Sequence, residues 1–518
     1  MRGRLHGLDY KWQVLMVVSV GTFMVVLDTT IVNIALPRII TVFGSSFDQA
    51  QLVITGYMLA LATIMPATTY LSQSYGTKRV YLVILALFTL GSMLCGLSWS
   101  IPTLVIARVL QGLGGGMIQP LGMALLFRVT PPNQRGKVMG LYALPVMVAP
   151  ILGPTLGGYL VEYVDWRWVF YLNVPAGALG LLLGLLLLRE SPTTRGTPFD
   201  LVGFIVGAVC FGSALLGATD APDKGWDDTG VVLKLALAAV TLPIFIGWEL
   251  RTSHPLLNLR LFAIPAFALG ALVNLVATAA LFGAIFLLPL FLQNLRGLGA
   301  METGLLLFPQ ALAMAVSVSL GGRLYDRVGA RPLIVAGLLV LGLATWLLSG
   351  LDLTTPDSTI RQVLLLRGAA IGLVMMPAMT TWLAAAPASQ TSAASSIQNV
   401  CRQLFGAFST AGFSTLLQSR ITFHYATLAM FVTPDSPAVL RALGQAQQLA
   451  LSRGMPLEQA RQLVLAQLTG YVQLAASVRG FDDCFIAAAA ACLVGVLPAL
   501  LLRRPAAAAS MPQVHVEA

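Results

Sequence analysis

The amino-acid sequence predicts an all-α, polytopic membrane protein. Of its 518 residues, 57% are hydrophobic and only 10% are charged, whereas soluble domains average about 25% charged residues. Apolar stretches of roughly 20 residues, enough to cross about 30 Å of hydrocarbon, recur from Trp12 to Leu502. Short polar or Gly/Pro-containing breaks separate them. A lipid bilayer is therefore the expected solvent for most of the chain.

The sequence contains fourteen such stretches. The first is too long for the core of a signal peptide and lacks a small-residue cleavage pattern, so we interpret it as a retained span. The expected spans are 13–36, 50–71, 80–99, 102–127, 138–160, 168–188, 200–219, 230–248, 265–292, 303–321, 332–350, 361–383, 395–418 and 482–502.

The basic residues alternate between the two sides of the membrane. A cytoplasmic N-terminus puts most of them, such as Lys78, Arg135 and Arg323, inside, and few, such as Arg167 and Arg296, outside. This bias is the positive-inside pattern, and an even number of spans returns the C-terminus to the cytoplasm. The net charge of +10 thus reflects topology, and no nucleic-acid partner is expected.

Two loops of the chain resemble each other. The run 322–331 shares a leucine, a turn glycine and a trailing basic residue with the run 69–79, which indicates an internal duplication. Glycine permits a tight turn, and charges at helix ends can pair with helix dipoles. A conformational latch is expected here; the alternative is that these loops only set topology. The expected latch residues are Gly76, Arg79, Asp326, Arg327 and Gly329.

Asp28 lies deep in the first predicted span. An aspartate at the centre of a membrane helix costs about 2.5–3.5 kcal/mol, so it is expected to face protein or water and to be functional. A carboxyl group that protonates on one side and ionises on the other is what proton exchange requires. The alternative is a structural aspartate tied to Thr29, Thr30, Asn33 or Arg38.

The fourth predicted span carries an arginine among glycines. Arg108, Gln111 and Gln119 are spaced by three and eight residues, so they can line one helix face toward a polar cavity. The glycine-rich run 112–116 lets another helix approach closely, which is also ordinary membrane packing.

The fifth predicted span contains two prolines and several glycines within ten residues. Missing amide donors predict a kink, and the glycines offer a smooth surface for a sliding neighbour. We expect it to act as part of the conformational gate; a generic kinked helix is the alternative. The residues are Pro150, Gly153, Pro154 and Gly157.

A substrate cavity is expected between the two halves of the chain. Methionine and aromatic side chains suit promiscuous binding, and amides with an arginine add polarity. For each residue the alternative is packing or contact with lipid. The expected lining residues are Asn33, Tyr57, Gln111, Met117, Gln119, Phe286, Gln398 and Arg402.

These motifs resemble the major facilitator superfamily, in which the loop motif recurs in both halves. The string Leu27–Pro37 resembles its fourteen-span drug:proton antiporter branch. The resemblance implies a six-helix bundle in 1–198, two inserted central helices in 199–262 and a second six-helix bundle in 263–518. It also implies proton coupling through Asp28 and Arg108, and export as the direction because the fifth-span motif marks antiporters.

One departure from the family pattern concerns the first loop. Gln73 and Ser74 stand where the family has an Asp-Arg pair, so charge-pair gating is expected to rest on Asp326 and Arg327. A second arginine motif, Arg367 with Gly372, is the expected counterpart of Arg108 in the second half.

The segment 419–480 is the longest connection. Ser436-Pro437 predicts a helix start, Gly454 a stop and Pro456 a second start, so two amphipathic external helices are expected. The segment resembles the corresponding loop of Emr-type multidrug pumps. That likeness implies a bacterial inner membrane and a periplasmic membrane-fusion adaptor docking at 419–480; a self-packed cap is the alternative. A short cytoplasmic tail is expected at 503–518.

The function expected is proton-coupled efflux of small lipophilic or amphipathic toxic compounds by alternating access. An exporter dedicated to one metabolite, lipid or siderophore is the alternative. No nucleotide-binding loop, no metal-ligand spacing and no interfacial catalytic cluster occurs, so no cofactor, metal site or enzymatic activity is expected. The five cysteines are dispersed through apolar spans. A receptor is the remaining class of membrane protein, and it would not need Asp28 and Arg108 deep within the membrane.

Overall fold

The computed structural model describes residues 9–502 apart from 192, 194–197, 433–436 and 455. Within these ranges the chain is helical and contains no strand. The helices are α2 Tyr10–Phe43, α3 Phe47–Ile64, α4 Thr68–Tyr75, α5 Thr77–Leu97, α6 Ile101–Val129, α7 Arg135–Tyr163, α8 Trp168–Tyr171, α9 Asn173–Leu187, α10 Leu201–Lys224, α11 Thr229–Arg251, α12 Pro265–Asn294, α13 Ala300–Val328, α14 Ala330–Leu347, α15 Asp357–Ala384, α16 Thr391–Ala429, α17 Pro437–Arg453 and α18 Leu457–Leu501.

The predicted spans coincide with helices. Among the described residues, twelve helical segments are long and apolar enough to cross a membrane. The other two predicted spans, 265–292 and 395–418, lie in α12 and α16, where the described apolar part of α12 is Pro265–Ala279 and α16 carries more polar residues. A helix forms its backbone hydrogen bonds within itself, so a single segment can cross the hydrocarbon core without leaving polar groups unpaired. The all-α polytopic prediction is confirmed.

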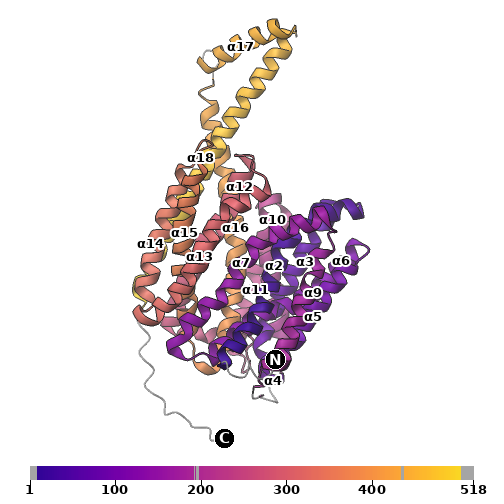
Figure 1. The fold of residues 1–518 in the computed structure, drawn as a ribbon, viewed down its shortest axis with the longest axis vertical. Helices are drawn as coiled ribbons and strands as arrows, with labels where there is room; N and C mark the ends of the chain where they lie inside the picture. Colours follow the sequence, from indigo (N-terminus) through magenta and orange to yellow (C-terminus); the bar gives the residue numbers. More distant parts are fainter. Residues whose placement is uncertain (1–8, 192, 194–197, 433–436, 455, 503–518) are drawn as a thin grey trace.

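The helices stand side by side in a bundle, and one hairpin projects from it (Figure 1). We call the end with this projection the distal end, and the opposite end, where α2 begins, the proximal end. The projection consists of α17 and the first part of α18, whose Ala446, Ala460 and Val464 pack together.

Both helices that the sequence predicts for the segment 419–480 are present. α17 begins at Pro437 and ends at Arg453, before Gly454, whose φ of 62° lies in the left-handed region that glycine adopts most easily. α18 begins after Pro456 and continues without a break through the last predicted span. Ser436 lies outside the described residues.

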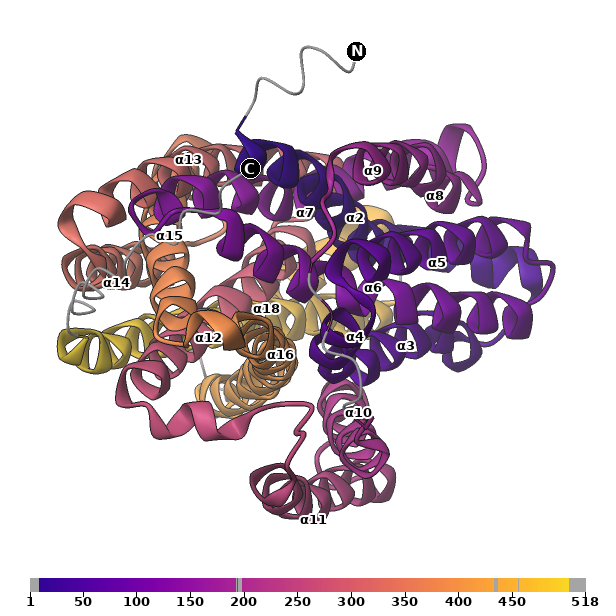
Figure 2. The ribbon, with the colours of Figure 1, turned by 90° about the horizontal axis from the view of Figure 1, so that it is seen from below.

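The hairpin of α10 and α11 is central in the sequence but peripheral in the fold (Figure 2). α10 packs against α3 from the first part of the chain and against α16 from the second. The Trp226 indole N–H donates to Thr415 Oγ1 of α16, and Asn258 Nδ2 donates to Gln390 Oε1 over 2.8 Å. The hairpin is therefore hydrogen-bonded to the second part of the chain at two places outside its helices. One lies in the turn between α10 and α11, and the other follows the end of α11.

Contacts between early and late helices seal the proximal end. Gly136 of α7 and Gly322 of α13 are so close that a Cβ added at either one would overlap the other's backbone oxygen. Ser395 Oγ of α16 donates to the Pro120 carbonyl of α6 over 2.8 Å. Thr69 and Ser396 share a hydrogen bond of 3.3 Å. The structure thus holds the proximal side closed by backbone packing and hydroxyl contacts.

Candidate functional site

Asp28 lies at the centre of a buried polar network. Its Oδ2 accepts a hydrogen bond from Arg108 Nη1 over 2.6 Å. Its Oδ1 accepts from Gln111 Nε2 over 2.9 Å and from Asn173 Nδ2 over 3.0 Å. The side chains of Asp28 and Arg108 are 0% and 1% exposed. The two residues predicted for proton coupling therefore form one ion pair, closed off from solvent in this conformation.

The Arg108 guanidinium has several partners besides Asp28. Nη1 also donates to Gln111 Oε1 over 2.7 Å, and Nε donates to the Val53 carbonyl of α3 over 3.3 Å. The ring of Tyr57 lies 3.9 Å from the guanidinium carbon, a cation–π distance. A buried charge needs this number of partners, because each unmet donor in a low-dielectric site is costly.

The sequence missed two members of this network, and the partners that the structural alternative gave Asp28 do not bond it. Asn173 of α9 and Ser92 of α5 were not predicted, although Asn173 donates both to Asp28 and to Ser92 Oγ over 3.0 Å. Thr29 and Thr30 donate to carbonyls of their own helix rather than to Asp28. A sequence signal that could have found Asn173 is its position as an amide within the sixth predicted span, shortly after a run of aromatic residues.

Helix α7, which carries the glycines of the fifth predicted span, packs against α2 close to Asp28. A Cβ added at Gly153 would overlap the hydroxyl of Thr30, and one added at Gly157 would lie 2.9 Å from the Ile31 side chain. α7 is one continuous helix across this contact; Pro150 is exposed, and the side chain of Pro154 lies outside the described residues. The glycines of the fifth predicted span thus allow α2 and α7 to touch one turn from the buried ion pair.

A second polar site is a cavity of about 60 Å³ between the early and late helices. Arg402 Nη2 of α16 donates across it to Gln119 Oε1 of α6 over 2.6 Å, and to Asn399 Oδ1 over 3.2 Å. This volume is far below the roughly 300–1,000 Å³ of drug-sized pockets, so a substrate requires the cavity to widen. Its lining residues are Gln119, Met123, Tyr142, Ala143, Val146, Asn274, Val318, Met375, Met376, Met379, Gln398, Asn399 and Arg402.

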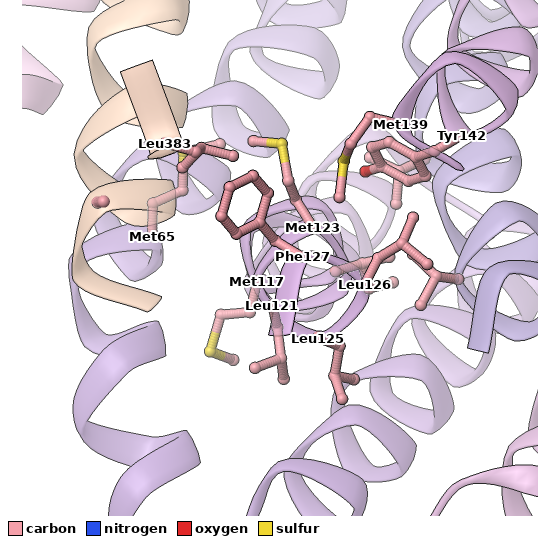
Figure 3. Close-up of a cluster of buried hydrophobic side chains, with 14 of the residues drawn as sticks. Met65, Met117, Leu121, Met123, Leu125, Leu126, Phe127, Met139, Tyr142 and Leu383 are labelled. Atoms are coloured by element: carbon pink, nitrogen blue, oxygen red, sulfur yellow. The ribbon is translucent and has the colours of Figure 1, made fainter. Parts of the chain in front are cut away.

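Three of the eight residues predicted for the cavity line it: Gln119, Gln398 and Arg402. Tyr57 and Gln111 belong to the Asp28 network instead. Met117 lies among apolar side chains in a packed cluster (Figure 3). Phe286 packs in another cluster, and Asn33 donates to the Thr29 carbonyl on an exposed face of α2. The helical period alone does not tell which face of a helix lines the cavity and which packs against a neighbouring helix.

The predicted latch residues occupy both proximal turns. Asp326 accepts hydrogen bonds from the backbone N–H groups of Gly136 and Lys137, over 3.1 and 3.3 Å, at the start of α7. Arg327 is exposed. Arg79 lies 3.5 Å from Glu190, and Gly76 and Gly329 adopt φ values of 89° and 90°. Asp326 therefore contacts a helix N-terminus, the position that favours negative charge, rather than relying on a charged partner.

A comparison with protein families matches the Major Facilitator Superfamily model to residues 18–410. The chain belongs to this superfamily. It is therefore a multi-pass membrane transporter of small molecules and not an enzyme, as predicted from the sequence.

Relatives of this major facilitator protein include one protein named for multidrug export and one named for multidrug resistance. It is 32% identical to the multidrug export protein EmrB of Escherichia coli (strain K12) over 87% of this chain and 88% of EmrB. It is 35% identical to the multidrug resistance protein Stp of Mycobacterium tuberculosis (strain ATCC 25618 / H37Rv), over 78% and 74%. It is also 34% identical to an uncharacterized MFS-type transporter, YhcA of Bacillus subtilis (strain 168), over 97% and 94%.

Solved structures share the fold. The proton:xylose symporter XylE superposes with a TM-score of 0.59 at 14% identity, covering 93% of this chain and 94% of XylE. A bacterial homologue of the lysosomal transporter Spinster gives 0.54 at 17% identity, covering 95% and 97%. At these identities the likeness concerns the fold alone.

The second buried arginine of this major facilitator protein differs sharply from Arg108. Arg367 of α15 is 0% exposed, and its Nη1 donates to Gln310 Oε1 over 3.2 Å. Its Nε and Nη2 have no hydrogen-bond partner among the described residues. The arginine motif is thus repeated in the second half without the aspartate that completes it in the first.

Replacing Arg367 by methionine is expected to stabilise the protein. Replacing a whole buried ion pair by packed apolar residues often adds about 1–4 kcal/mol to the free energy of unfolding, and a gain of similar size is expected here because two guanidinium nitrogens of Arg367 have no partner among the described residues. The matched variant Arg108→Met is expected to cost about 3–5 kcal/mol, because it leaves Asp28 buried and unpaired. Unfolding in lipid nanodiscs measures both. A loss of stability in Arg367→Met as large as that in Arg108→Met would contradict this contrast.

Proposed function

We propose that this major facilitator protein is a proton-coupled multidrug exporter that moves small lipophilic or amphipathic compounds by alternating access. The observation that carries the proposal is the Asp28–Arg108 pair, a carboxylate buried within a span and bound to one cation and two amides. Protonation of Asp28 removes the Coulombic attraction to Arg108, which is strong at low dielectric. The pair can therefore exist in two states of different packing.

The same helix links this pair to the cavity. Gln111, which bonds Asp28, and Gln119, which bonds Arg402, both lie on α6. A shift of α6 when Asp28 takes up a proton would change the contact of Gln119 with Arg402. The glycine contact of α7 with α2 lies beside the pair, and α7 also holds Asp326 at the proximal seal. Proton binding can thus bias both the cavity and the seal.

The orientation and organisation we propose follow from the sequence. The proximal end faces the cytoplasm of a bacterial inner membrane, since the basic loops gather there. Residues 1–198 and 263–518 act as the two moving bundles, and 199–262 is the inserted pair. The projection within 419–480 then lies in the periplasm, and we propose it as the docking site of a membrane-fusion adaptor. The relation to EmrB supports an export pump.

Substrate-dependent proton flux in proteoliposomes tests the function. The purified protein should dissipate an imposed pH gradient when members of a panel of lipophilic cations, neutral aromatics and weak aromatic acids are added. Flux with several unrelated compounds is expected. Flux with a single compound would favour the alternative, an exporter dedicated to one metabolite, lipid or siderophore. No flux with any compound would refute proton-coupled export of drugs.

Asp326→Asn is expected to loosen the proximal seal. The carboxylate sits at the N-terminus of α7, where a negative charge contributes about 0.3–2 kcal/mol. Asparagine keeps one acceptor but loses the charge. The measurement is the rate at which a membrane-impermeant thiol reagent reacts with Ser395→Cys at the seal, in a background without the five native cysteines. A two- to thirtyfold faster reaction is expected, and an unchanged rate would contradict the latch.

A further inference from the structure

The cavity carries a positive charge that has only neutral partners. Arg402 is the single charged side chain among the lining residues that the structure describes, and the atoms it bonds are amide oxygens of Gln119 and Asn399. A guanidinium is always protonated and presents five donors in a planar fork suited to carboxylate. Held by neutral amides, it keeps its preference for an anion.

The carboxylate of the first span does not balance this charge. Asp28 is 0% exposed, and both of its oxygens are engaged by Arg108, Gln111 and Asn173. A substrate in the cavity therefore meets Arg402 and not Asp28. The negative charge that would attract a cationic compound is sequestered away from the lining.

Other groups that line the cavity indicate which further features of a substrate it can bind. Asn274 Oδ1 and Gln398 Oε1 are buried acceptors with no hydrogen-bond partner among the described residues, and both side chains line the cavity. Met123, Met375 and Met379 supply polarisable apolar walls. The lining thus offers an anion partner, two acceptors for N–H or O–H groups and an apolar surface for an aromatic body.

We infer that the transported compounds are amphipathic organic anions, with an aromatic body and a carboxylate, phenolate or sulfonate that binds Arg402. This inference rests on the proposed export function and narrows its substrate class. The acidic group replaces Gln119 Oε1 on the guanidinium, because a charge-assisted hydrogen bond is roughly twice as strong as a neutral one. Since the Gln119–Arg402 bond joins α6 to α16, this replacement separates the two helices and widens the cavity.

Three compounds with one scaffold test the inference. Naphthalene-1-acetate, naphthalene-1-acetamide and 2-(1-naphthyl)ethylamine are an anion, a neutral molecule and a cation at pH 7.5. Equilibrium dialysis against the full-length protein in nanodiscs measures their binding. The anion is expected to bind at least about tenfold more tightly than the cation, as charged partners at close quarters do. Tighter binding of the amine, equal binding of the two, or no binding of the acetate would overturn the inference.

Variants locate the effect at Arg402. Arg402→Gln is expected to abolish the preference for the anion, and Arg402→Lys to retain most of it because the charge remains. Arg361→Gln, an exposed arginine on α15, is the control for surface charge and should leave the preference intact. A preference that persists in Arg402→Gln would overturn the inference even if Arg402→Lys failed to fold.

Proton flux separates this inference from the function on which it rests. If the amine drives faster proton flux than the acetate, export stands and the anion assignment fails. If the acetate binds through Arg402 but no compound drives flux, the binding site stands and proton-coupled export fails.

Discussion

Asp28→Asn is expected to abolish substrate-dependent proton flux while substrate binding persists. Asparagine has the shape of the protonated aspartate, so it keeps hydrogen bonds with Gln111 and Asn173 but cannot release a proton. If Asp28 is the coupling group, the variant stays in the protonated state of the cycle. Flux in proteoliposomes is expected to fall to the background of empty vesicles, with naphthalene-1-acetate still bound.

The control is the double variant Asp28→Asn/Arg108→Gln. This double variant removes both charges, so Arg108 is no longer left buried without a counter-ion as it is in the single variant. It is expected to regain stability without regaining flux. Near-normal flux in Asp28→Asn would show that Asp28 is structural. Loss of binding together with flux in a protein that unfolds at a much lower temperature would equally assign it a structural role.

Gly136→Val is expected to break the proximal seal. A side chain at this position meets the backbone oxygen of Gly322, and backbone atoms cannot yield as a flexible side chain does. Overpacking of this kind costs about 1–3 kcal/mol, which shifts a two-state equilibrium about five- to 150-fold toward the open proximal side. Spin labels at the exposed positions Arg128 and Arg323, without the native cysteines, measure the separation of α6 and α13.

Gly158→Val is the matched control on the same helix. A Cβ at Gly158 meets no heavy atom within 4 Å, so the substitution adds the same side chain without a clash. The label distance in this variant is expected to match that of the unmodified protein. A Gly136→Val distance distribution identical to the control would mean that the glycine contact does not hold the proximal side closed.

Local sequence determined the helices and the chemistry buried in them. Hydrophobic stretches of span length predicted where the helices lie, because a single segment in hydrocarbon can pair all its backbone N–H and C=O groups only as a helix. Ser436, Pro437 and Gly454 predicted the bounds of α17 by their backbone preferences. Asp28 and Arg108 were predicted to be functional because a charged side chain at membrane depth is costly and therefore usually has a functional role.

Only the tertiary structure decided which residues meet. A helical period tells which side chains share a face, but not which neighbouring helix that face touches. Asn173 joins Asp28 across 145 positions of sequence, Met117 turns into a packed cluster rather than the cavity, and Asp326 reaches the start of α7. Each outcome depends on how helices far apart in sequence pack together, and close packing at glycines such as Gly136 and Gly322 fixes that arrangement.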